Sequence, residues 1–344
     1  MVYRVAWMKG DGIGPEISDV AVEILQLIGD LYGISWDIRF YEMGDEAKRR
    51  LGTALPQETL DGIRTADLAI KGPVGETAFE TVVYIRQKLD LYANIRPARS
   101  YEGVPYVRPI DVVIVRENTE DLYRGIEFTV DGAAVALKII TEHATRRIAR
   151  VAASYAMSRR RKVTIVHKAN VMRVTDGLFR DVAKRELSGY DLVVDEKYVD
   201  AMSMALIRNP QDFDVILTPN VYGDILSDEA AQIAGGLGFA ASANIGERNS
   251  LFEPVHGSAP DIAGRGIANP YSMLNVLVMA LEHLWLTRSD GRARDAREAL
   301  ESAIVSSIRR GYLTPDAGGK FKTGEIGKVV GQELKGYVDK ADHR

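Results

Sequence analysis

Cysteine is absent from the 344-residue chain. This absence excludes disulfides, thiol nucleophiles, Cys-ligated zinc and iron–sulfur clusters. Long apolar runs are missing too, since no segment approaches the roughly 20 consecutive apolar residues that a membrane span needs. The first residues lead directly into a glycine-rich turn and lack the apolar stretch of a secretory signal. We therefore expect a cytoplasmic protein without a membrane partner.

Neither sign of charge is in excess. The 44 Lys and Arg residues face 48 Asp and Glu residues, which gives a formal net charge of −4. A protein that binds nucleic acid usually has a basic surplus, so we expect no nucleic-acid partner. Hydrophobic residues make up 46% and charged residues 27% of the chain, as in ordinary globular proteins. At this length the composition predicts a large α/β enzyme or two packed domains.

Strands and helices alternate along the first part of the chain. The sequence predicts strands over residues 2–8, 35–41 and 66–71. Apolar spacing predicts helices over about 16–30 and 57–64. This alternation is typical of a parallel or mixed sheet with helices on its faces.

The pattern changes after residue 96. Residues 125–141 alternate weakly around a glycine turn and predict a hairpin or β-arm. Further strands are predicted over 111–116, 163–167, 191–196 and 215–218, and helices over 142–158, 175–187, 270–286 and 293–310. No repeat or long linker separates the parts, so we expect one domain to be inserted into the other.

Two acids stand four residues apart at Asp224 and Asp228. On a helix they would face the same way, where like charges repel by roughly a few tenths of a kcal/mol. A divalent cation with oxygen ligands would turn this repulsion into a binding site. The pair follows the predicted strand 215–218, and ligands gather at strand ends in α/β sheets. The alternative is a solvated acidic face at the start of a helix.

Three arginines, Arg86, Arg96 and Arg116, lie within apolar stretches of sequence. Arginine is seldom buried without a partner, and its guanidinium group matches a carboxylate in two places. The three could therefore form a carboxylate-binding pocket. The alternative is three structural ion pairs with nearby acids such as Asp90 or Glu117.

Lys168 follows a predicted strand, and Tyr123 lies in a polar segment. A lysine at a strand end can act as a general base when burial or neighbouring cations lower its pKa. Both residue types are common on protein surfaces, so position alone does not give either one a catalytic role.

Two glycine-rich segments could approach a nucleotide. The turn at residues 10–15 fails the G-x-G-x-x-G spacing because Pro15 replaces the last glycine. No strand-end acid follows about 20 residues later, so a Rossmann site is disfavoured. The segment 256–264 offers backbone donors, small side chains and an acid that could bind ribose hydroxyls. The alternative is a structural loop.

Taken together, these stretches resemble the β-decarboxylating dehydrogenases, the family of isocitrate, isopropylmalate, homoisocitrate and tartrate dehydrogenases. The resemblance covers nearly the whole chain, in the order that the family has. The matching runs are Gly10–Glu16, Leu91–Pro97, Val115–Glu120, His167–Asn170, Asn220–Asp228, Glu253–Asp261 and Leu313–Gly319. The run around Asp224 and Asp228 is highly specific.

The resemblance implies the oxidation of a 2-hydroxy acid substrate with loss of its β-carboxylate. Arg86, Arg96 and Arg116 would hold the carboxylate that leaves. Asp224 and Asp228, with Asp200 as a third ligand, would bind Mg²⁺ or Mn²⁺. Lys168 would be the general base, and Tyr123 would protonate the enol carbon. Because Lys168 and Asp200 would come from the partner subunit, the resemblance implies a homodimer with shared active sites.

The resemblance also implies NAD as the cofactor. Family members that use NAD have an acid and an aliphatic residue where NADP enzymes have Lys and Tyr, and here these positions are Asp261 and Ile262. A carboxylate can accept hydrogen bonds from the ribose hydroxyls and repels a 2′-phosphate. The implied cofactor-binding residues are His256, Gly257, Ser258, Ala259, Asp261, Ile262, Asn269 and Asn170.

The substrate's variable group would face the helix before Arg86. Isocitrate enzymes have Ser and Asn there, and homoisocitrate enzymes have an Arg near Val83. The apolar pair Val82 and Val83 suits an isopropyl group, whose burial stabilises by about 1.5–3 kcal/mol. Bacterial isopropylmalate enzymes have a Glu where Phe79 lies, which is a departure here. Core packing of the two valines is the alternative, and homoisocitrate or isocitrate remains the alternative substrate.

The family's fold implies two α/β domains around a mixed central sheet that is not a Rossmann fold. Residues 1–95 and 235–344 would form a discontinuous cofactor-binding domain. Residues 96–234 would form the inserted domain with the dimer helices and the β-arm. A non-catalytic regulatory subunit is the rival from another class, but such subunits usually lose part of the site, and here the set is complete.

Overall fold

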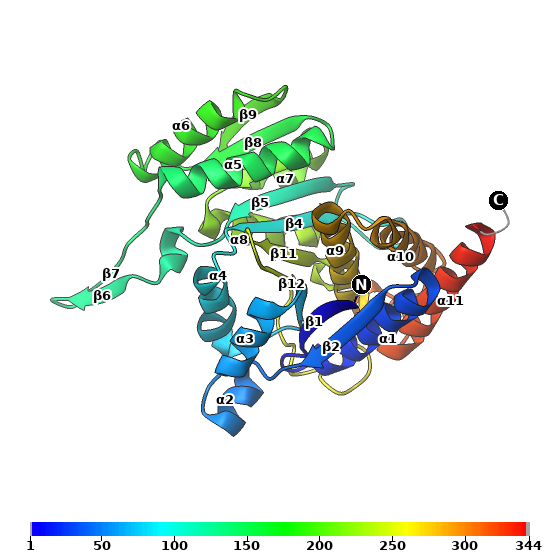
Figure 1. Ribbon diagram of the computed structural model, residues 1–344. Coiled ribbons are helices and arrows are strands. Elements are labelled where there is room, and N and C mark those ends of the chain that lie inside the picture. Colours follow the sequence, from blue (N-terminus) through cyan, green and yellow to red (C-terminus); the bar gives the residue numbers. More distant parts are fainter. Residues whose placement is uncertain (1, 342–344) are drawn as a thin grey trace.

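The computed structural model describes residues 2–341, and its centre is a ten-stranded mixed sheet (Figure 1). In spatial order the strands are β2 (Ser35–Phe40), β1 (Val2–Met8), β3 (Leu68–Lys71), β12 (Ser250–Pro254), β11 (Ala241–Ile245), β4 (Ala93–Arg99), β5 (Asp111–Glu117), β10 (Val215–Thr218), β8 (Lys162–His167) and β9 (Val193–Tyr198). Parallel strands at the two ends are joined through antiparallel pairs at β12–β11, β11–β4 and β4–β5. The predicted mixed sheet, distinct from a Rossmann fold, is confirmed.

Helices cover both faces of this sheet. They are α1 (Gly14–Tyr32), α2 (Asp45–Leu51), α3 (Gln57–Thr65), α4 (Tyr84–Lys88), α5 (Glu142–Met157), α6 (Thr175–Leu187), α7 (Val199–Arg208), α8 (Asn220–Ala234), α9 (Tyr271–Arg288), α10 (Gly291–Arg309) and α11 (Thr323–Ala341). Side chains that alternate along β8 show the two layers, because Val163 and Ile165 pack in the cluster with α5 and α6. Val166 belongs instead to the cluster that contains Met202 of α7 and Leu226 of α8.

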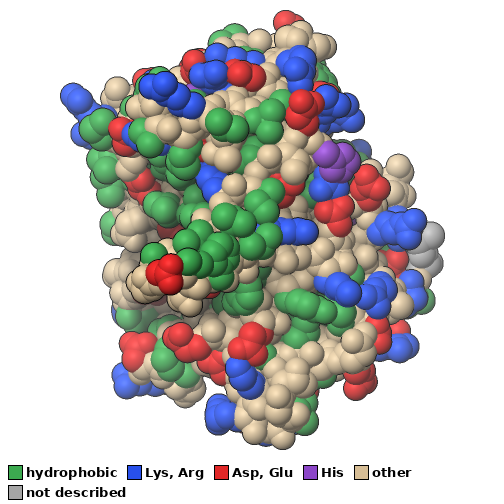
Figure 2. Space-filling view, turned by 90° about the vertical axis from the view of Figure 1, so that its left-hand side faces the viewer, with side chains coloured by type: hydrophobic (Ala, Val, Ile, Leu, Met, Phe, Trp, Pro, Cys, Tyr) green, Lys and Arg blue, Asp and Glu red, His purple; other side chains and the backbone are tan. Residues whose placement is uncertain are grey.

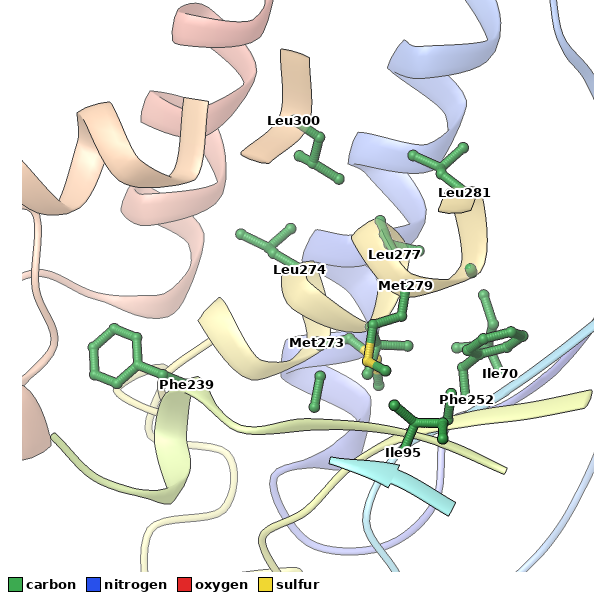
Figure 3. Packing of buried hydrophobic residues seen from close by; sticks show 14 of the residues in the cluster. Ile70, Ile95, Phe239, Phe252, Met273, Leu274, Leu277, Met279, Leu281 and Leu300 are labelled. Atoms are coloured by element: carbon green, nitrogen blue, oxygen red, sulfur yellow. The ribbon is translucent and has the colours of Figure 1, made fainter. Parts of the chain in front are cut away.

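The core is thickest where α9 crosses the sheet. Helix α9 is apolar on most sides, as expected for a helix enclosed by protein. Its Leu274, Leu277 and Leu281 are buried between the sheet and the neighbouring helices, where Leu300 of α10 and Phe252 of β12 close the packing (Figure 3). This layer fixes β11 and β12 and therefore the loops that follow them.

Elements with a strong pattern lie where the sequence predicted them. Strand β1 and helix α6 match the predicted ranges, and the arm is a hairpin of β6 (Glu127–Val130) and β7 (Ala133–Ala136) that projects from the molecule (Figure 1). The elements that the pattern missed include α2, α7, α11, β4, β11 and β12. Helix α2 buries only Ala47 and therefore has no apolar stripe. Strand β4 contains Asn94, Arg96 and Pro97, which argue against a central strand.

The sheet runs without a break across the predicted domain boundary. Residues 1–95 and 235–344 supply β1, β2, β3, β11 and β12, and residues 96–234 supply β5, β8, β9 and β10. Strand β4 spans the boundary and pairs with β5 along its whole length. The division into two domains stays a prediction. In the described part of the chain, no helix has both the length and the apolar character to cross a membrane.

Candidate active site

The three arginines converge from a helix and two strands. Arg96 lies on β4 and Arg116 on the neighbouring antiparallel strand β5, while Arg86 lies on α4. A π-helical turn, Phe79–Val83, precedes α4. Turns of this kind are rare and often occur at functional sites. All three guanidinium groups are buried, so each needs a partner that offsets the cost of removing its charge from water.

The two acids of α8 supply part of that compensation. Helix α8 begins directly after β10, which pairs with β5, so Asp224 and Asp228 come to the same end of β5 as Arg116. Arg116 donates to Asp224 and, through Nε at 2.9 Å, to Asn220. Arg96 Nη1 lies 3.3 Å from an oxygen of each aspartate. The carboxylates of Asp224 and Asp228 therefore lie close together, because both contact the same nitrogen atom of Arg96.

Tyr123 closes the same cluster. Its hydroxyl donates to Asp224, and its ring centroid lies 4.9 Å from the Arg116 guanidinium carbon. Burial raises the pKa of Tyr123, and Asp224 raises it further. The hydroxyl therefore keeps its proton at neutral pH and can donate it.

The two aspartates have different proton affinities. Burial alone would raise the pKa of Asp224, but Arg116, Arg96 and the Tyr123 hydroxyl bring it below its ordinary value. At Asp228, burial raises the pKa, and the charge of Asp224 adds to this against the opposing effect of Arg96. Two carboxylates that crowd each other and remain partly exposed suit a divalent cation with oxygen ligands.

Glu253 is a buried acid of the site for which the sequence analysis predicted no role of its own. It follows the centre of β12, where its carboxylate lies 2.8 Å from Lys71 Nζ and 2.9 Å from Arg86 Nη2. All three residues are buried. Burial would raise the pKa of Glu253, but the two cations hold it far below the ordinary range. No spacing in the sequence indicates this pairing, because the partners lie on three separate elements.

Buried amides connect this ion cluster to Arg96. Asn244 Nδ2 donates to Glu253 at 2.7 Å, and Asn94 Nδ2 donates to Asn244 Oδ1 at 2.9 Å. Arg96 Nε in turn donates to Asn94 Oδ1 at 2.7 Å. This chain of hydrogen bonds crosses β12, β11 and β4, so the orientation of each arginine depends on strands from distant parts of the sequence.

Lys168 and Asp200 form a separate pair. Lys168 follows β8 and Asp200 lies in the first turn of α7, and their side chains meet at 2.6 Å. The pKa of Asp200 is lowered, chiefly by this hydrogen bond from Lys168. Within residues 2–341, no ion pair or hydrogen bond joins these two residues to Asp224 or Asp228, and no group of three acidic or histidine ligands occurs. The predicted third metal ligand is thus not beside the other two within one chain.

Five of the eight predicted cofactor residues line a cavity of about 340 Å³ beside the start of α9, whereas Ser258, Asp261 and Asn170 do not line it. Its lining residues are Ile13, Gly238, His256, Gly257, Ala259, Ile262, Ile267, Asn269, Pro315 and Asp316. Asn269 Nδ2 donates to Asp316 at 3.1 Å, a partner that the sequence did not indicate. Asp261 is exposed next to this cavity's wall, and Asn170 is exposed beside Lys168, outside the lining. The cofactor roles of these residues stay predictions.

The turn at residues 10–14 packs against the loop of residues 256–264 through Gly12 and Ile13. A Cβ atom on Gly12 would lie 1.9 Å from the Ser258 carbonyl oxygen, so only glycine fits. The Ile13 amide donates to the same carbonyl at 2.9 Å. Gly12 therefore allows the turn to approach the loop of residues 256–264, which explains a glycine there without a dinucleotide-binding role.

Val82 and Val83 are buried in the π-helical turn before Arg86. Neither valine belongs to the buried hydrophobic clusters of the described residues. Phe79 is exposed and lies against Gly125, while Glu80 pairs with Lys48 on the surface. Val82 and Val83 thus form an apolar surface one turn before Arg86, and their contact with a substrate stays a prediction.

Comparison with known proteins gives consistent matches over the chain. The profile of the isocitrate/isopropylmalate dehydrogenase family matches residues 4–330. A 3-isopropylmalate dehydrogenase of Saccharolobus solfataricus is 53% identical over 94% of this chain and 96% of its own. One from Sulfurisphaera tokodaii is 52% identical over 95% and 97%. The crystal structure of isocitrate dehydrogenase from Methylococcus capsulatus superposes with a TM-score of 0.89 at 41% identity, over 96% of this chain and 99% of that one.

Replacing Glu253 by Gln should lower the free energy of unfolding by about 3–5 kcal/mol at neutral pH, because two buried cations lose their shared counter-charge. Denaturant titration measures this. Because the folded-state pKa of Glu253 is lowered, the stabilisation is present above the ordinary carboxyl pKa of 4.5 and is lost as the pH falls. The difference in the free energy of unfolding between the wild type and Glu253→Gln should therefore become smaller at acidic pH.

The matched control is Glu102→Gln, which removes a solvent-exposed pair with Arg309 and should cost less than about 1 kcal/mol. Equal losses in the two variants would contradict the assignment of Glu253 as the counter-ion of Lys71 and Arg86.

Proposed function

The chain belongs to the isocitrate/isopropylmalate dehydrogenase family, and we propose that it catalyses the NAD-dependent oxidative decarboxylation of 3-isopropylmalate to 2-oxoisocaproate and CO₂, a step of leucine biosynthesis. Membership makes it a decarboxylating dehydrogenase. The finer function rests above all on one observation. Three buried arginines lie near one another: Arg96 and Arg116 contact the carboxylates of α8, and Arg86 follows the apolar turn of Val82 and Val83.

The arginine cluster supplies the charge that holds the leaving carboxylate. Its members repel one another: burial lowers the pKa of Arg116, and the charges of Arg96 and Arg86 lower it further against the opposing effect of Asp224. Arg86 Nε is buried and has no hydrogen-bond acceptor among the described residues. An anionic substrate with a carboxylate would relieve the repulsion and provide that acceptor.

Asp224 and Asp228 would hold a divalent cation, Mg²⁺ or Mn²⁺, through their oxygen atoms, with Asp200 of a second subunit as a further ligand. When bound, the cation would polarise the substrate's C–O bond and offset the charge left after CO₂ departs, while NAD would accept the hydride. Arg96, which now contacts both aspartates, would be available to the substrate's carboxylate when Asp224 and Asp228 hold the cation.

Two proton transfers complete the chemistry. Lys168 would take the proton of the substrate hydroxyl as the hydride leaves the carbon that carries this hydroxyl. Loss of CO₂ then leaves a neighbouring carbon that needs a proton. Tyr123 would deliver it, because its raised pKa keeps the phenol protonated at neutral pH. Both groups are strong hydrogen-bond partners of acids in the structure, Lys168 of Asp200 and Tyr123 of Asp224.

The cavity beside α9 would take the adenosine part of NAD. Its lining is largely apolar, with Ile13, Ile262 and Ile267 suited to a flat aromatic ring, and Asn269 and Asp316 offer polar atoms. Asp261 is exposed at the neighbouring position, where its carboxylate could meet ribose hydroxyls and repel a phosphate. NADP is therefore disfavoured on electrostatic grounds.

A homodimer would bring the two half-sites together. Lys168 and Asp200 would serve the cluster of the partner subunit, since among the described residues neither side chain has an ion pair except with the other. Hydrophobic side chains that such a contact would bury are exposed on α7 and α8, with Met204 and Ile225 each 62% exposed. The arm exposes Ile126, Phe128 and Val130, and hydrophobic side chains gather in the middle of the face from which it projects (Figure 2). Exposed patches of this kind are typical of association surfaces.

The purified chain with Mn²⁺, NAD and 3-isopropylmalate should produce NADH. Its kcat/KM should exceed the values for isocitrate and homoisocitrate by at least about tenfold, because Val82 and Val83 offer no partner for an additional carboxylate. Likeness to a crystallised isocitrate dehydrogenase makes isocitrate the second candidate. A higher kcat/KM for isocitrate or homoisocitrate would reject the isopropylmalate assignment. No NADH with any of the three would favour a non-catalytic subunit.

The double variant Asp261→Lys, Ile262→Tyr should lose the preference for NAD. The lysine would attract the 2′-phosphate that Asp261 repels, so the ratio of kcat/KM for NAD over NADP should fall by at least about tenfold. Ile267→Val, which keeps the cavity apolar, is the matched control and should preserve the ratio. A wild-type enzyme that already prefers NADP would refute this reading.

Mixed dimers test the shared site. Lys168→Ala and Asp224→Asn should each abolish activity in homodimers. Co-expressed with two different tags and purified as the mixed species, they should regain about half of the wild-type kcat, because one of two sites then has both groups intact. If all catalytic groups came from one chain, the mixed dimer would be inactive.

A further inference from the structure

Lys138 lies outside the arginine cluster, between the segment that carries Tyr123 and the segment that carries Lys168. Lys138 follows β7, in the segment that returns from the arm to α5, and its side chain is only 11% exposed. Its Nζ lies 2.9 Å from Asp176 Oδ1 and 3.4 Å from Asp121 Oδ1, and both carboxylates are fully buried. It also stacks over the Tyr222 ring at 4.3 Å. Lysine is rarely buried unless it is paired, so this position calls for a specific role.

On one side the network reaches Lys168. Asp176, near the start of α6, accepts the Lys168 backbone amide through Oδ2 at 2.7 Å. Its other oxygen faces Lys138. The Lys168 carbonyl accepts the amides of Val171 and Met172, so the turn that carries Lys168 is held at both its ends. Asp176 therefore fixes the backbone from which the catalytic lysine extends.

On the other side the network reaches Tyr123 and α8. Asp121 Oδ2 accepts the Val221 amide at 3.0 Å, in the first turn of α8 and three residues before Asp224. Asp121 has a φ of 64°, an uncommon conformation for a residue other than glycine. The carboxylate also accepts the Leu122 amide at 2.9 Å, directly before Tyr123. The interaction of Asp121 with Lys138 helps to hold this conformation.

We propose that Lys138 is a positioning residue for the decarboxylating dehydrogenase reaction, acting through Asp176 on Lys168 and through Asp121 on Tyr123 and Asp224. Without its ammonium group, two buried carboxylates would face each other, and one would take up a proton or move. Either change removes an acceptor from the Lys168 or the Val221 amide. The action of one Lys138 on two active sites rests on the homodimer proposed above. If Lys168 serves the partner's site, Lys138 of one chain acts on both active sites of the dimer.

In the homodimer, Lys138→Met should lower kcat by at least about tenfold, because a misplacement of about 1 Å is enough for such a loss. KM for the substrate should change much less than kcat, since among the described residues Lys138 contacts Asp121, Asp176 and Tyr222 and no arginine of the cluster. Lys138→Arg keeps the charge and should restore most of the kcat. Lys162→Met removes a half-buried lysine paired with Asp195 at the opposite end of β8, and it should leave kcat unchanged.

Thermal melting of each variant separates misfolding from mispositioning, and Lys138→Gln provides the same test if the Met variant does not fold. A kcat loss in Lys138→Met that Lys138→Arg rescues, with KM preserved, supports the positioning role. An unchanged kcat, or a loss that Lys138→Arg fails to rescue, overturns it.

Mixed dimers show whether Lys138 acts on both sites. One subunit carries Lys168→Ala and the other Asp224→Asn, so the single intact site takes Tyr123 and Asp224 from the first and Lys168 from the second. Lys138→Met is then placed in either subunit. We expect kcat to fall by at least about tenfold in both placements.

A fall in neither placement, or in only one, overturns the two-sided role. The parent mixed dimer, without the Lys138 substitution, separates this result from a failure of the proposed dimer. If the parent dimer is inactive, the shared site is wrong. If it is active, the placements report on Lys138 alone.

Discussion

Three buried guanidinium groups are the constraint around which this molecule is built. Arg86, Arg96 and Arg116 cannot leave water without anions and acceptors that face them from all sides. The chain provides these from separate elements: Glu253 from β12, Asp224 from α8 and Asn94 from β4. Since the arginines also repel one another, the arrangement keeps an excess of positive charge at one place. An anionic substrate can bind there without first displacing a complete set of partners.

The mixed sheet makes this convergence possible. Antiparallel pairs between its two parallel blocks bring β12, β11, β4 and β5 side by side. Because neighbouring strands run in opposite directions there, the end of β5 lies beside the start of β4, and side chains from both reach one space. A sheet with all strands parallel would instead place its ligand groups in loops at a single edge. Here the arginines lie on the strands and at the start of a helix, where packing restricts their motion.

Carboxylates that accept backbone amides fix the loops around this centre. Asp11 accepts the amides of Asp45 and Gly75, and Glu16 accepts those of Gly266 and Ala268, which follow the loop of residues 256–264. Glu117 does the same for Thr119 and Glu120, and burial raises its pKa to about 7. Asp121 and Asp176 belong to this group, with Lys138 as a cation shared between them. Side chains thus perform a task that regular secondary structure cannot, because these amides lie in loops or in the first turns of helices, where no backbone carbonyl of the same helix can accept them.

The sequence by itself determined the elements with a clear period, the family, and the identity of most of the candidate site. Asp224 and Asp228 follow from helical spacing, and the arginines, Lys168 and Tyr123 from motifs that the family shares. Only the tertiary structure decided which of these groups face one another. Lys71 and Lys138 have no local signal, and the family motif that contains Glu253 does not indicate its partners, since each of the three pairs through contacts between segments far apart in the chain. Strand β4 was hidden for the same reason: its polar residues oppose a central strand locally and are stable there only because Asn244, Ser227 and the acids of α8 satisfy them. Short-range pattern reflects which face of an element is buried, whereas the pairing of buried charges depends on where the whole chain places their partners.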